Sequence, residues 1–249
     1  MRTNERYLEA LRYMDKTMRA DNKAGDQWSY CNVTSKKVRG FENKRKKKKF
    51  LTNCVDGVQD ALRIAGIPES ALGWYGTDSK IAYTGKDAKK EAEKYFRIIK
   101  TGGKTPQQLF DSMSMADGDV LLGYKGISHT NCFIGGATPK SFDSGHAFCS
   151  GEDFKKWIGS LCHKNTKVFY ILRLKDRAHY RVQCGAYINL ASYNEMVRNI
   201  ESAGYSTAMV REDNLYKISA GYFDGKTNAE RLAAELTKKG ISAYVKEVD

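Results

Sequence analysis

Cys54 and His129 are the two residues of this sequence whose side chains could be combined for nucleophilic chemistry. Cys54 directly precedes apolar residues that recur at helical spacing from Val55 to Ile64, which predicts an amphipathic helix over residues 55–65 with the cysteine at its first turn. Unpaired backbone N–H groups and the positive end of the helix dipole favour the thiolate there, and the thiolate attacks carbonyls. A buried cysteine is equally ordinary in a core, so a chemical role for Cys54 requires a base.

A predicted β-hairpin supplies the candidate base. Residues 128–136 have the composition of a strand that ends in a turn, and residues 140–146 return from it. Because opposite residues of a hairpin share a face, His129 can contact a polar side chain that orients it while it takes the thiol proton. Simple pairing about the turn places His146 opposite His129, whereas a looser turn places Asp143 there, and both stay open as the third residue.

The elements around these residues mix helices and strands. Helical spacing and strand patterns alternate without long low-complexity segments, so we expect residues 1–175 to form one α+β domain with an antiparallel sheet and helices. The predicted helices cover residues 5–18, 86–99 and 105–110, and the predicted strands cover residues 115–124 and 167–174.

Composition fits a folded protein without a membrane span. The chain has 249 residues and is 41% hydrophobic, which is enough for the cores of two domains. No apolar run approaches the ~18 residues of a transmembrane helix, and the first residues lack the apolar segment of a signal peptide. We therefore expect synthesis in the cytoplasm without an export signal.

The six cysteines are scattered and form neither a CxxC motif nor a zinc-ligand pattern. In a chain of this length such spacing is typical of reduced cysteines rather than of a disulfide framework. We expect no metal and no other cofactor.

The net charge of +13 belongs to residues 1–179, because nine Lys and Arg balance nine Asp and Glu in the remainder. The densest basic run is Lys44–Lys49. Such a run predicts attraction to a polyanion, which could be nucleic acid, a membrane surface or the teichoic acid of a Gram-positive wall, or else it is a solvated loop. No base-reading motif or aromatic platform accompanies it, which disfavours nucleic acid.

The clearest pattern in the chain is an internal repeat. The segment Tyr180–Tyr187 recurs as Tyr216–Phe223, and each copy is followed by a helical pattern, a glycine and a strand pattern. Two such halves predict the βαββαβ order of a ferredoxin-like domain over residues 179–249. The predicted helices cover residues 192–203 and 227–239, and the strands after them cover residues 205–210 and 241–245.

Alternation along the repeated strands separates two faces of the predicted sheet. Apolar residues point toward the helices, and polar residues point away from them. The free face therefore either contacts water alone or presents hydrogen-bonding side chains to a ligand. The residues that we expect there are Arg181, Gln183, Lys217 and Ser219, with Tyr180 and Tyr216 near the edge.

Four motifs, in their order along the chain, resemble the NlpC-type papain-like cell-wall cysteine hydrolases. The resemblance spans about residues 25–175 and implies a papain-like catalytic domain. It implies that Cys54 is the nucleophile, His129 the base, Asp143 the orienting residue and Tyr30 an aromatic residue near the nucleophile. The motifs are Asn53–Gly57, Gly118–Val120, Ser128–Thr130 and Phe133–Gly135.

The repeated C-terminal region resembles the SPOR domain, whose Arg-Val-Gln-x-Gly start is matched from Arg181 onward. This resemblance implies binding, through the sheet surface, to peptidoglycan glycan strands that have lost their stem peptides.

Together the two resemblances imply a phage endolysin that acts on the wall of a Gram-positive host after release from the cytoplasm. It would cleave an amide in or at the stem peptide, as an N-acetylmuramoyl-L-alanine amidase or as an endopeptidase after D-glutamate. The alternative is a non-catalytic wall-binding or division-associated protein whose N-terminal domain is a degenerate scaffold. A basic nucleic-acid-binding protein is a third and weaker hypothesis.

Overall fold

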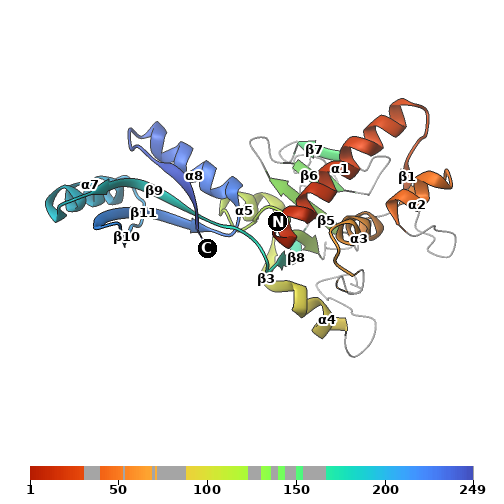
Figure 1. Ribbon diagram of the computed structural model, residues 1–249, viewed down its shortest axis with the longest axis horizontal. Coiled ribbons are helices and arrows are strands. Elements are labelled where there is room, and N and C mark those ends of the chain that lie inside the picture. The colour runs from red at the N-terminus through yellow and green to blue at the C-terminus, as the bar shows by residue number, and fades with distance from the viewer. Residues whose placement is uncertain are drawn as a thin grey trace. The chain divides into compact units, whose positions relative to one another are not determined.

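The computed structural model divides the chain into two compact units, Met1–Arg177 and Ala178–Asp249, each described here by itself. Figure 1 shows the helices and strands of both units. No helix in the described part of the chain combines the length and apolar character that a bilayer crossing requires. The structure describes residues 1–30, 40–52, 54–68, 71, 88–122, 130–135, 140–143, 150–153 and 167–248.

Five helices with described bounds belong to the N-terminal unit, and their starts follow ordinary helix chemistry. Thr105 caps the fifth through a capping box with Gln108, and Pro106 occupies its first turn. The predicted opening helix is present and longer than expected. The helices are α1 (Thr3–Lys23), α2 (Phe41–Lys46), α3 (Cys54–Ile64), α4 (Ala88–Tyr95) and α5 (Pro106–Asp111).

A six-stranded antiparallel sheet, in the order β3-β8-β4-β5-β6-β7, forms the centre of this unit. A separate pair, β1 (Ser29–Tyr30) and β2 (Leu51–Thr52), is parallel. The strands of the large sheet are β3 (Phe96–Lys104), β4 (Val120–Leu122), β5 (Thr130–Gly135), β6 (Lys140–Asp143), β7 (Ser150–Asp153) and β8 (Val168–Leu174).

The helix predicted over residues 86–99 is wrong at its C-terminal end. The helix α4 ends at Tyr95, and Phe96 begins strand β3, in which Ile98 pairs with Leu172 of β8. The helical pattern comes from the Lys- and Glu-rich first half, whereas β-branched Ile98 and Ile99 gain more from pairing with a strand.

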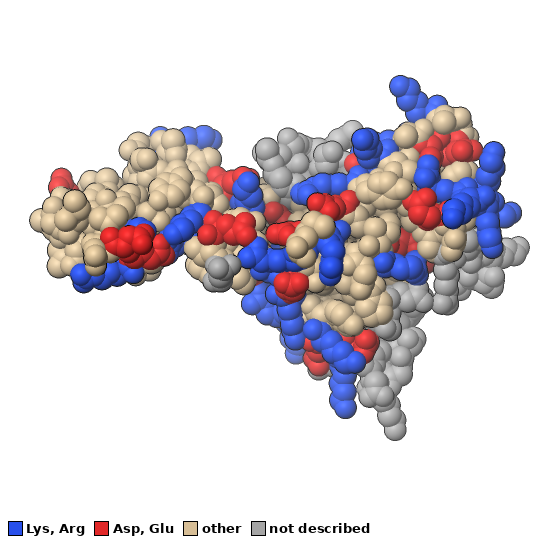
Figure 2. All heavy atoms as spheres, viewed as in Figure 1, with Lys and Arg blue, Asp and Glu red and all other residues tan. Residues whose placement is uncertain are grey.

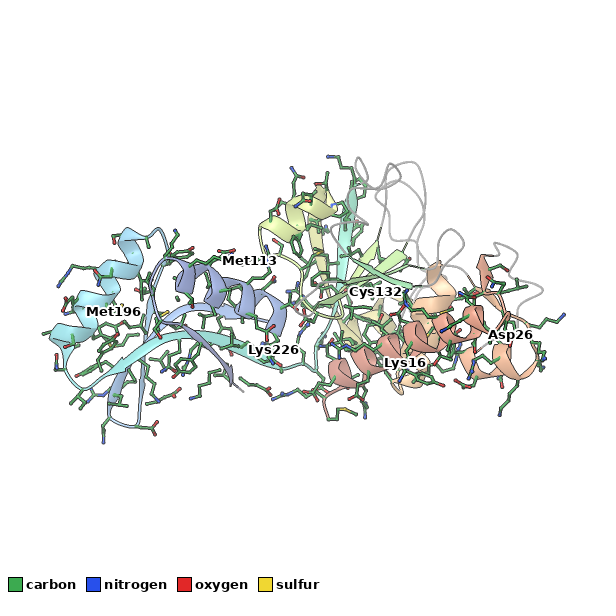
Figure 3. The ribbon with its side chains drawn as sticks, turned by 90° about the horizontal axis from the view of Figure 1, so that it is seen from above. Lys16, Asp26, Met113, Cys132, Met196 and Lys226 are labelled. Atoms are coloured by element: carbon green, nitrogen blue, oxygen red, sulfur yellow. The ribbon has the colours of Figure 1, made fainter. Side chains whose placement is uncertain are left out.

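The two faces of the six-stranded sheet are covered by different helices. On one face, Val120 and Leu122 join a cluster with Leu11 of α1 and Leu62 of α3. Cys132 belongs to the same cluster, is fully buried and lies 2.8 Å from the Tyr7 hydroxyl, as the interior position in Figure 3 illustrates. On the other face, a smaller cluster contains Leu109 and Phe110 of α5 with Leu121, Phe133 and Ile171.

The C-terminal unit has the predicted βαββαβ order and an antiparallel four-stranded sheet arranged β10-β11-β9-β12. Both helices contribute to one core with the sheet, since Ile200, Leu232 and Leu236 pack with Val182 and Ile218. The elements are β9 (His179–Tyr187), α7 (Leu190–Ser202), β10 (Ala208–Glu212), β11 (Leu215–Phe223), α8 (Lys226–Lys238) and β12 (Tyr244–Val248).

Each of the two central strands carries a glycine at an irregularity in the register. Gly185 of β9 has a φ of 84°, a conformation that favours glycine. Gly221 of β11 faces the core so closely that an added Cβ would lie 2.7 Å from Leu232. Because such a bulge changes the alternation, Tyr222 pairs with Arg181 and shares its face of the sheet.

Candidate functional site

Cys54 is the first residue of α3, as the helical pattern predicts. Asp56 lies in the first turn, where a carboxylate interacts favourably with the helix dipole. The backbone therefore places the cysteine where a thiolate would be stabilised. Its side chain lies outside what the structure describes, as does all of Asn53.

Tyr30 reaches the neighbourhood of this helix start through the parallel strand pair. Tyr30 of β1 pairs with Thr52 of β2, and Thr52 precedes Cys54 by two residues. The chain thus brings the backbone of the predicted aromatic residue beside the segment that leads into the nucleophile helix. The side chain of Tyr30 is not among the described parts of the structure.

The predicted hairpin is present in the described residues, and its register differs from the looser pairing. Asp143, the last residue of β6, pairs with Asn131 of β5, and β5 begins at Thr130. The pairing that would set Asp143 directly opposite His129 is therefore wrong by two residues, because Lys140 pairs with Gly135 without the expected looser turn and the irregularity between Phe133 and Gly135 shifts the register by only one residue. His129 and His146 lie outside the described residues.

The Gly118-Asp119 motif has a structural role. Asp119 is fully buried and accepts hydrogen bonds from Nε and Nη2 of Arg173 at 2.9 and 2.6 Å. Arg177 also lies 3.5 Å from this carboxylate. Gly118 has a φ of 85°, and a Cβ there would lie 2.5 Å from the Asn4 side chain. This turn joins α1, β4 and the end of the N-terminal unit, a tertiary role that the sequence pattern does not reveal.

The face of the C-terminal sheet opposite α7 and α8, here called the outer face, carries the four predicted polar residues, but they are not open to solvent. Arg181, Gln183, Lys217 and Ser219 are 5%, 2%, 8% and 7% exposed. The expectation of a free hydrated surface at these positions is wrong, because they lie on the two central strands and hydrogen bond along the face. A ligand would meet the side chains around them first.

Tyr180 and Tyr216 lie on the opposite side from the one expected. Both pack against the hydrophobic cluster that α7 and α8 share with the sheet. Tyr216 lies near Tyr193, with 6.1 Å between ring centroids, and the Arg211 guanidinium lies 5.0 Å above the Tyr216 ring. Alternation explains this placement, since Tyr180 and Tyr216 precede the core residues Val182 and Ile218 by two.

Glu212, on β10, connects the cations of the outer face. It accepts hydrogen bonds from Arg181 at 3.0 Å, Lys217 at 3.0 Å and Lys246 at 2.8 Å. These hydrogen bonds, with that from Arg181 foremost, hold the pKa of Glu212 far below its usual range. Lys217 also donates to Asp213 at 2.9 Å, and these contacts raise the pKa of Lys217. Three cations and two carboxylates leave this network with one net positive charge.

Two exposed tyrosines on the outer face were missed by the sequence analysis. Tyr222 is 58% exposed and its ring stacks on His179 at 5.8 Å between centroids. Tyr244 is 52% exposed and pairs with Gln183. Tyr244 could have been assigned to the outer face from sequence, because it alternates with the apolar Val245 in the last strand. Tyr222 could not, because its assignment to this face depends on the bulge at Gly221.

The described residues contain no group of three His, Cys, Asp or Glu side chains that could hold a metal ion. Cys132 and Cys184 are buried thiols. Burial raises the pKa of Cys184 to about 11, so its thiol stays protonated at neutral pH. Cys184 is a core residue, as the alternation predicts.

Comparisons with known proteins concern the C-terminal unit. The family model described as the SPOR domain matches residues 176–247. The solved peptidoglycan binding domain of the B. subtilis cell wall lytic enzyme CwlC is 32% identical to this chain over a match that covers 30% of this chain and 95% of that domain, with a TM-score of 0.29. No curated protein matches the chain. The resemblance of residues 25–175 to NlpC-type hydrolases stays a prediction, whereas the C-terminal unit of this chain is a SPOR domain.

Proposed function

We propose that this protein binds peptidoglycan through the outer face of its SPOR domain. The match of residues 176–247 to the SPOR family carries the proposal. The composition of the outer face supports it, because exposed tyrosine rings lie there beside a cluster of cations. Ligand sites that combine an apolar contact surface with a few placed polar groups are typical of specific recognition.

The tyrosines suit a sugar chain. A pyranose ring presents C–H groups on one face, and an aromatic ring covers such a surface while its polar tip stays in water. Tyr222 and Tyr244 are each more than half exposed, so their rings are available for such packing. His179 supports the Tyr222 ring from the neighbouring strand.

The cations suit the second feature of a glycan that has lost its stem peptides. Removing the peptide from muramic acid converts an amide into a carboxylate, and charge-assisted hydrogen bonds to carboxylates are among the stronger polar contacts. Lys246 is 41% exposed at its side chain and lies beside Arg181 in the register, so it is the cation best placed for this contact. The net positive charge of the Glu212 network has the required sign.

Binding to purified peptidoglycan tests this function. The full chain should bind sacculi, and it should bind glycan strands stripped by an amidase more tightly than strands that keep their peptides. Cosedimentation and calorimetry measure both. Equal affinity for the two ligands would contradict the role of the carboxylate, and no binding to either would contradict the function itself.

For the N-terminal unit we propose cysteine-dependent cleavage of an amide in or at the stem peptide. The position of Cys54 at the start of α3 and the pairing of Tyr30 beside Thr52 support it. In this mechanism Cys54 attacks the carbonyl, His129 takes the thiol proton and then protonates the leaving amine, and water hydrolyses the thioester. Attachment to a wall-binding domain raises the local concentration of the scissile bond.

This enzyme proposal places the protein at the wall of a Gram-positive host, released from the cytoplasm during phage lysis. Turbidity loss of purified walls should disappear in Cys54→Ala while binding to the same walls persists. The same lysis assay on Asp143→Asn and His146→Asn decides which of the two orients His129. Mass spectrometry of released fragments identifies the amide.

The competing proposal is a wall-binding protein without hydrolase activity. It is favoured by the restriction of the family match to residues 176–247. Binding by the wild-type chain with no turbidity loss and no released fragments would establish it and remove the enzyme proposal.

A further inference from the structure

The basic run Lys44–Lys49 is divided by the fold into two parts with different roles. Lys44 and Arg45 point into the N-terminal unit and are paired with carboxylates. Lys46, Lys47, Lys48 and Lys49 are all exposed. These four residues, here called the lysine turn, end helix α2 and carry the positive charge outward, as the blue side chains over α2 in Figure 2 illustrate.

Lys44 fixes the lysine turn to helix α3. Its ammonium group lies 2.6 Å from the Asp60 carboxylate, and the two side chains are only 2% and 4% exposed. Asp60 also pairs with Arg63 at 2.5 Å. Removing one partner of a buried ion pair leaves an uncompensated charge, so this contact holds α2 firmly in place.

Arg45 fixes the other side of α2 to α1. Its guanidinium donates two hydrogen bonds to Asp21, at 2.9 and 3.0 Å, and the Trp28 indole donates a third at 3.0 Å. Although burial acts in the opposite direction, the hydrogen bonds from Arg45 and Trp28 lower the pKa of Asp21. The Trp28 ring also stacks on Phe41 at 5.1 Å between centroids.

The backbone of the lysine turn is ordered as well. The amide of Lys49 donates to the Lys44 carbonyl at 2.8 Å, and the amide of Lys48 donates to the Arg45 carbonyl at 3.0 Å. Lys48 has a φ of 49°, a left-handed conformation that a lysine rarely adopts. The dipole of a helix is equivalent to about half a negative unit charge at its C-terminus, so the four positive charges of the lysine turn exceed what is needed to neutralise the dipole of α2.

Helix α1, which packs against α2 through Tyr13 and Phe41, adds further cations. Arg12, Lys16 and Lys23 are exposed and share one side of α1 because they are spaced by four and seven residues. Lys16 is labelled in Figure 3. The summed potential of these charges attracts anions over distances of about 10 Å at moderate salt.

We propose that the lysine turn binds a phosphodiester-linked anionic polymer of the cell wall, with successive phosphates contacting successive lysines. The choice of a wall polymer rests on the proposed function of the SPOR domain. Nucleic acid fits less well, because base recognition on single strands uses exposed aromatic rings. In the described part of the N-terminal unit the strongly exposed ring is Tyr13, whose hydroxyl donates to Glu42.

The test compares two walls and two variants of the full chain. Purified Gram-positive sacculi are used with their poly(glycerol phosphate) or poly(ribitol phosphate) chains intact, or after acid removal of these chains. The quadruple variant Lys46→Gln, Lys47→Gln, Lys48→Gln, Lys49→Gln keeps Lys44 and Arg45. The matched control, Lys90→Gln, Lys94→Gln, Lys100→Gln, Lys104→Gln, removes the same charge from exposed lysines spread over α4 and β3.

The wild type and the control should bind intact sacculi more tightly than stripped sacculi, and the lysine-turn variant should lose that difference. On soluble poly(glycerol phosphate), the slope of log affinity against log salt should fall by roughly 3 in the lysine-turn variant, at about 0.7 for each of four contacts. Equal losses in both quadruple variants, or tighter binding to single-stranded DNA of matched charge, would overturn the proposal. Binding to stripped sacculi does not involve the phosphodiester polymer, so failure there is recognisable as failure of the proposed function.

Discussion

The two halves of the outer face descend from one repeated pattern and carry different side chains. Positions 36 residues apart, such as Tyr180 and Tyr216, are equivalent. The register preserves this relation. Arg181 is equivalent to Lys217, and Ala186 is equivalent to Tyr222. The pair of Tyr222 with Arg181 is therefore matched by the pair of Ala186 with Lys217. Tyr244 of β12 corresponds in the same way to Ala208 of β10.

The two halves differ in the side chains that they expose. The aromatic half contains Tyr222, Tyr244 and His179, and two of these side chains are more than half exposed. The aliphatic half has Ala186 and Ala208 at the positions equivalent to the two tyrosines. It also contains Glu212, which holds cations that belong to both halves. Under the proposed function, the aromatic half contacts the sugar and the aliphatic half holds the cations in place.

The largest expected effect is on affinity. Tyr222→Ala combined with Tyr244→Ala should weaken binding to stripped glycan strands at least 30-fold, since truncating one exposed aromatic anchor costs about 2 kcal/mol. In the aliphatic half, Val210 pairs with Lys217 and Leu215 pairs with Glu212, so both lie on the outer face. The matched change there, Val210→Ala with Leu215→Ala, should leave affinity nearly unchanged. Calorimetry on both variants measures the contrast, and equal losses would abolish the distinction between the halves.

The two bulge glycines provide the second contrast. Gly221→Ala should lower the free energy of unfolding by about 1–3 kcal/mol because its Cβ meets Leu232 in the core. It should also weaken glycan binding by moving Tyr222. Gly185→Ala strains a left-handed backbone, and its Cβ meets the hydroxyl and two ring carbons of Tyr187. Because Tyr187 packs on the helix side of the sheet, this change should lower stability without affecting binding. Urea unfolding and calorimetry separate these outcomes, and a binding loss in Gly185→Ala would count against the assignment.

A smaller effect is expected from adding aromatic rings to the aliphatic half. Ala208→Tyr should strengthen glycan binding by less than about tenfold, which corresponds to at most 1.4 kcal/mol. A gain in glycan affinity would indicate that the aliphatic half lacks only the aromatic side chain needed for binding. An unchanged affinity would indicate that the Glu212 network blocks the aliphatic half.

The smallest effect concerns pH. The pKa of Glu212 is lower in the folded protein than its ordinary value of 4.5, so its contribution to stability is present above that value and is lost as the pH falls toward the folded pKa. Glu212→Gln should therefore lower the melting temperature at pH 7, and the difference from wild type should shrink below pH 4.5. A difference that persists at low pH would show that Glu212 acts through packing.

The fold of the SPOR domain could be predicted from sequence because local patterns decide it. Alternation and helical spacing specify six elements, and the repeat specifies their order. The site was less predictable. Strict alternation assigns Tyr222 to the helix side, and only the bulge at Gly221 moves it to the outer face. The reach of Glu212 to Lys246 depends on tertiary geometry that no spacing along the chain reveals.

The N-terminal unit shows the same limit. The helix start at Cys54 and the strands of the hairpin follow from local patterns, whereas the register that pairs Asp143 with Asn131 depends on an irregularity near Gly135. The burial of Lys44 is similar, because a run of six basic residues gives no sign that one of them pairs with Asp60 inside the protein.

The connection between the units has a practical consequence for dividing the protein. The family match begins at residue 176, yet the Asp176 carboxylate accepts hydrogen bonds from the backbone and hydroxyl of Thr3 at 2.8 and 2.7 Å, and Arg177 donates to the Asp117 carbonyl at 2.5 Å. An N-terminal fragment that ends at the family boundary would lack Asp176 and Arg177, and with Asp176 it would lose the hydrogen bonds that hold the start of α1. Expression of the halves should divide them after Arg177, so that each fragment keeps its own contacts.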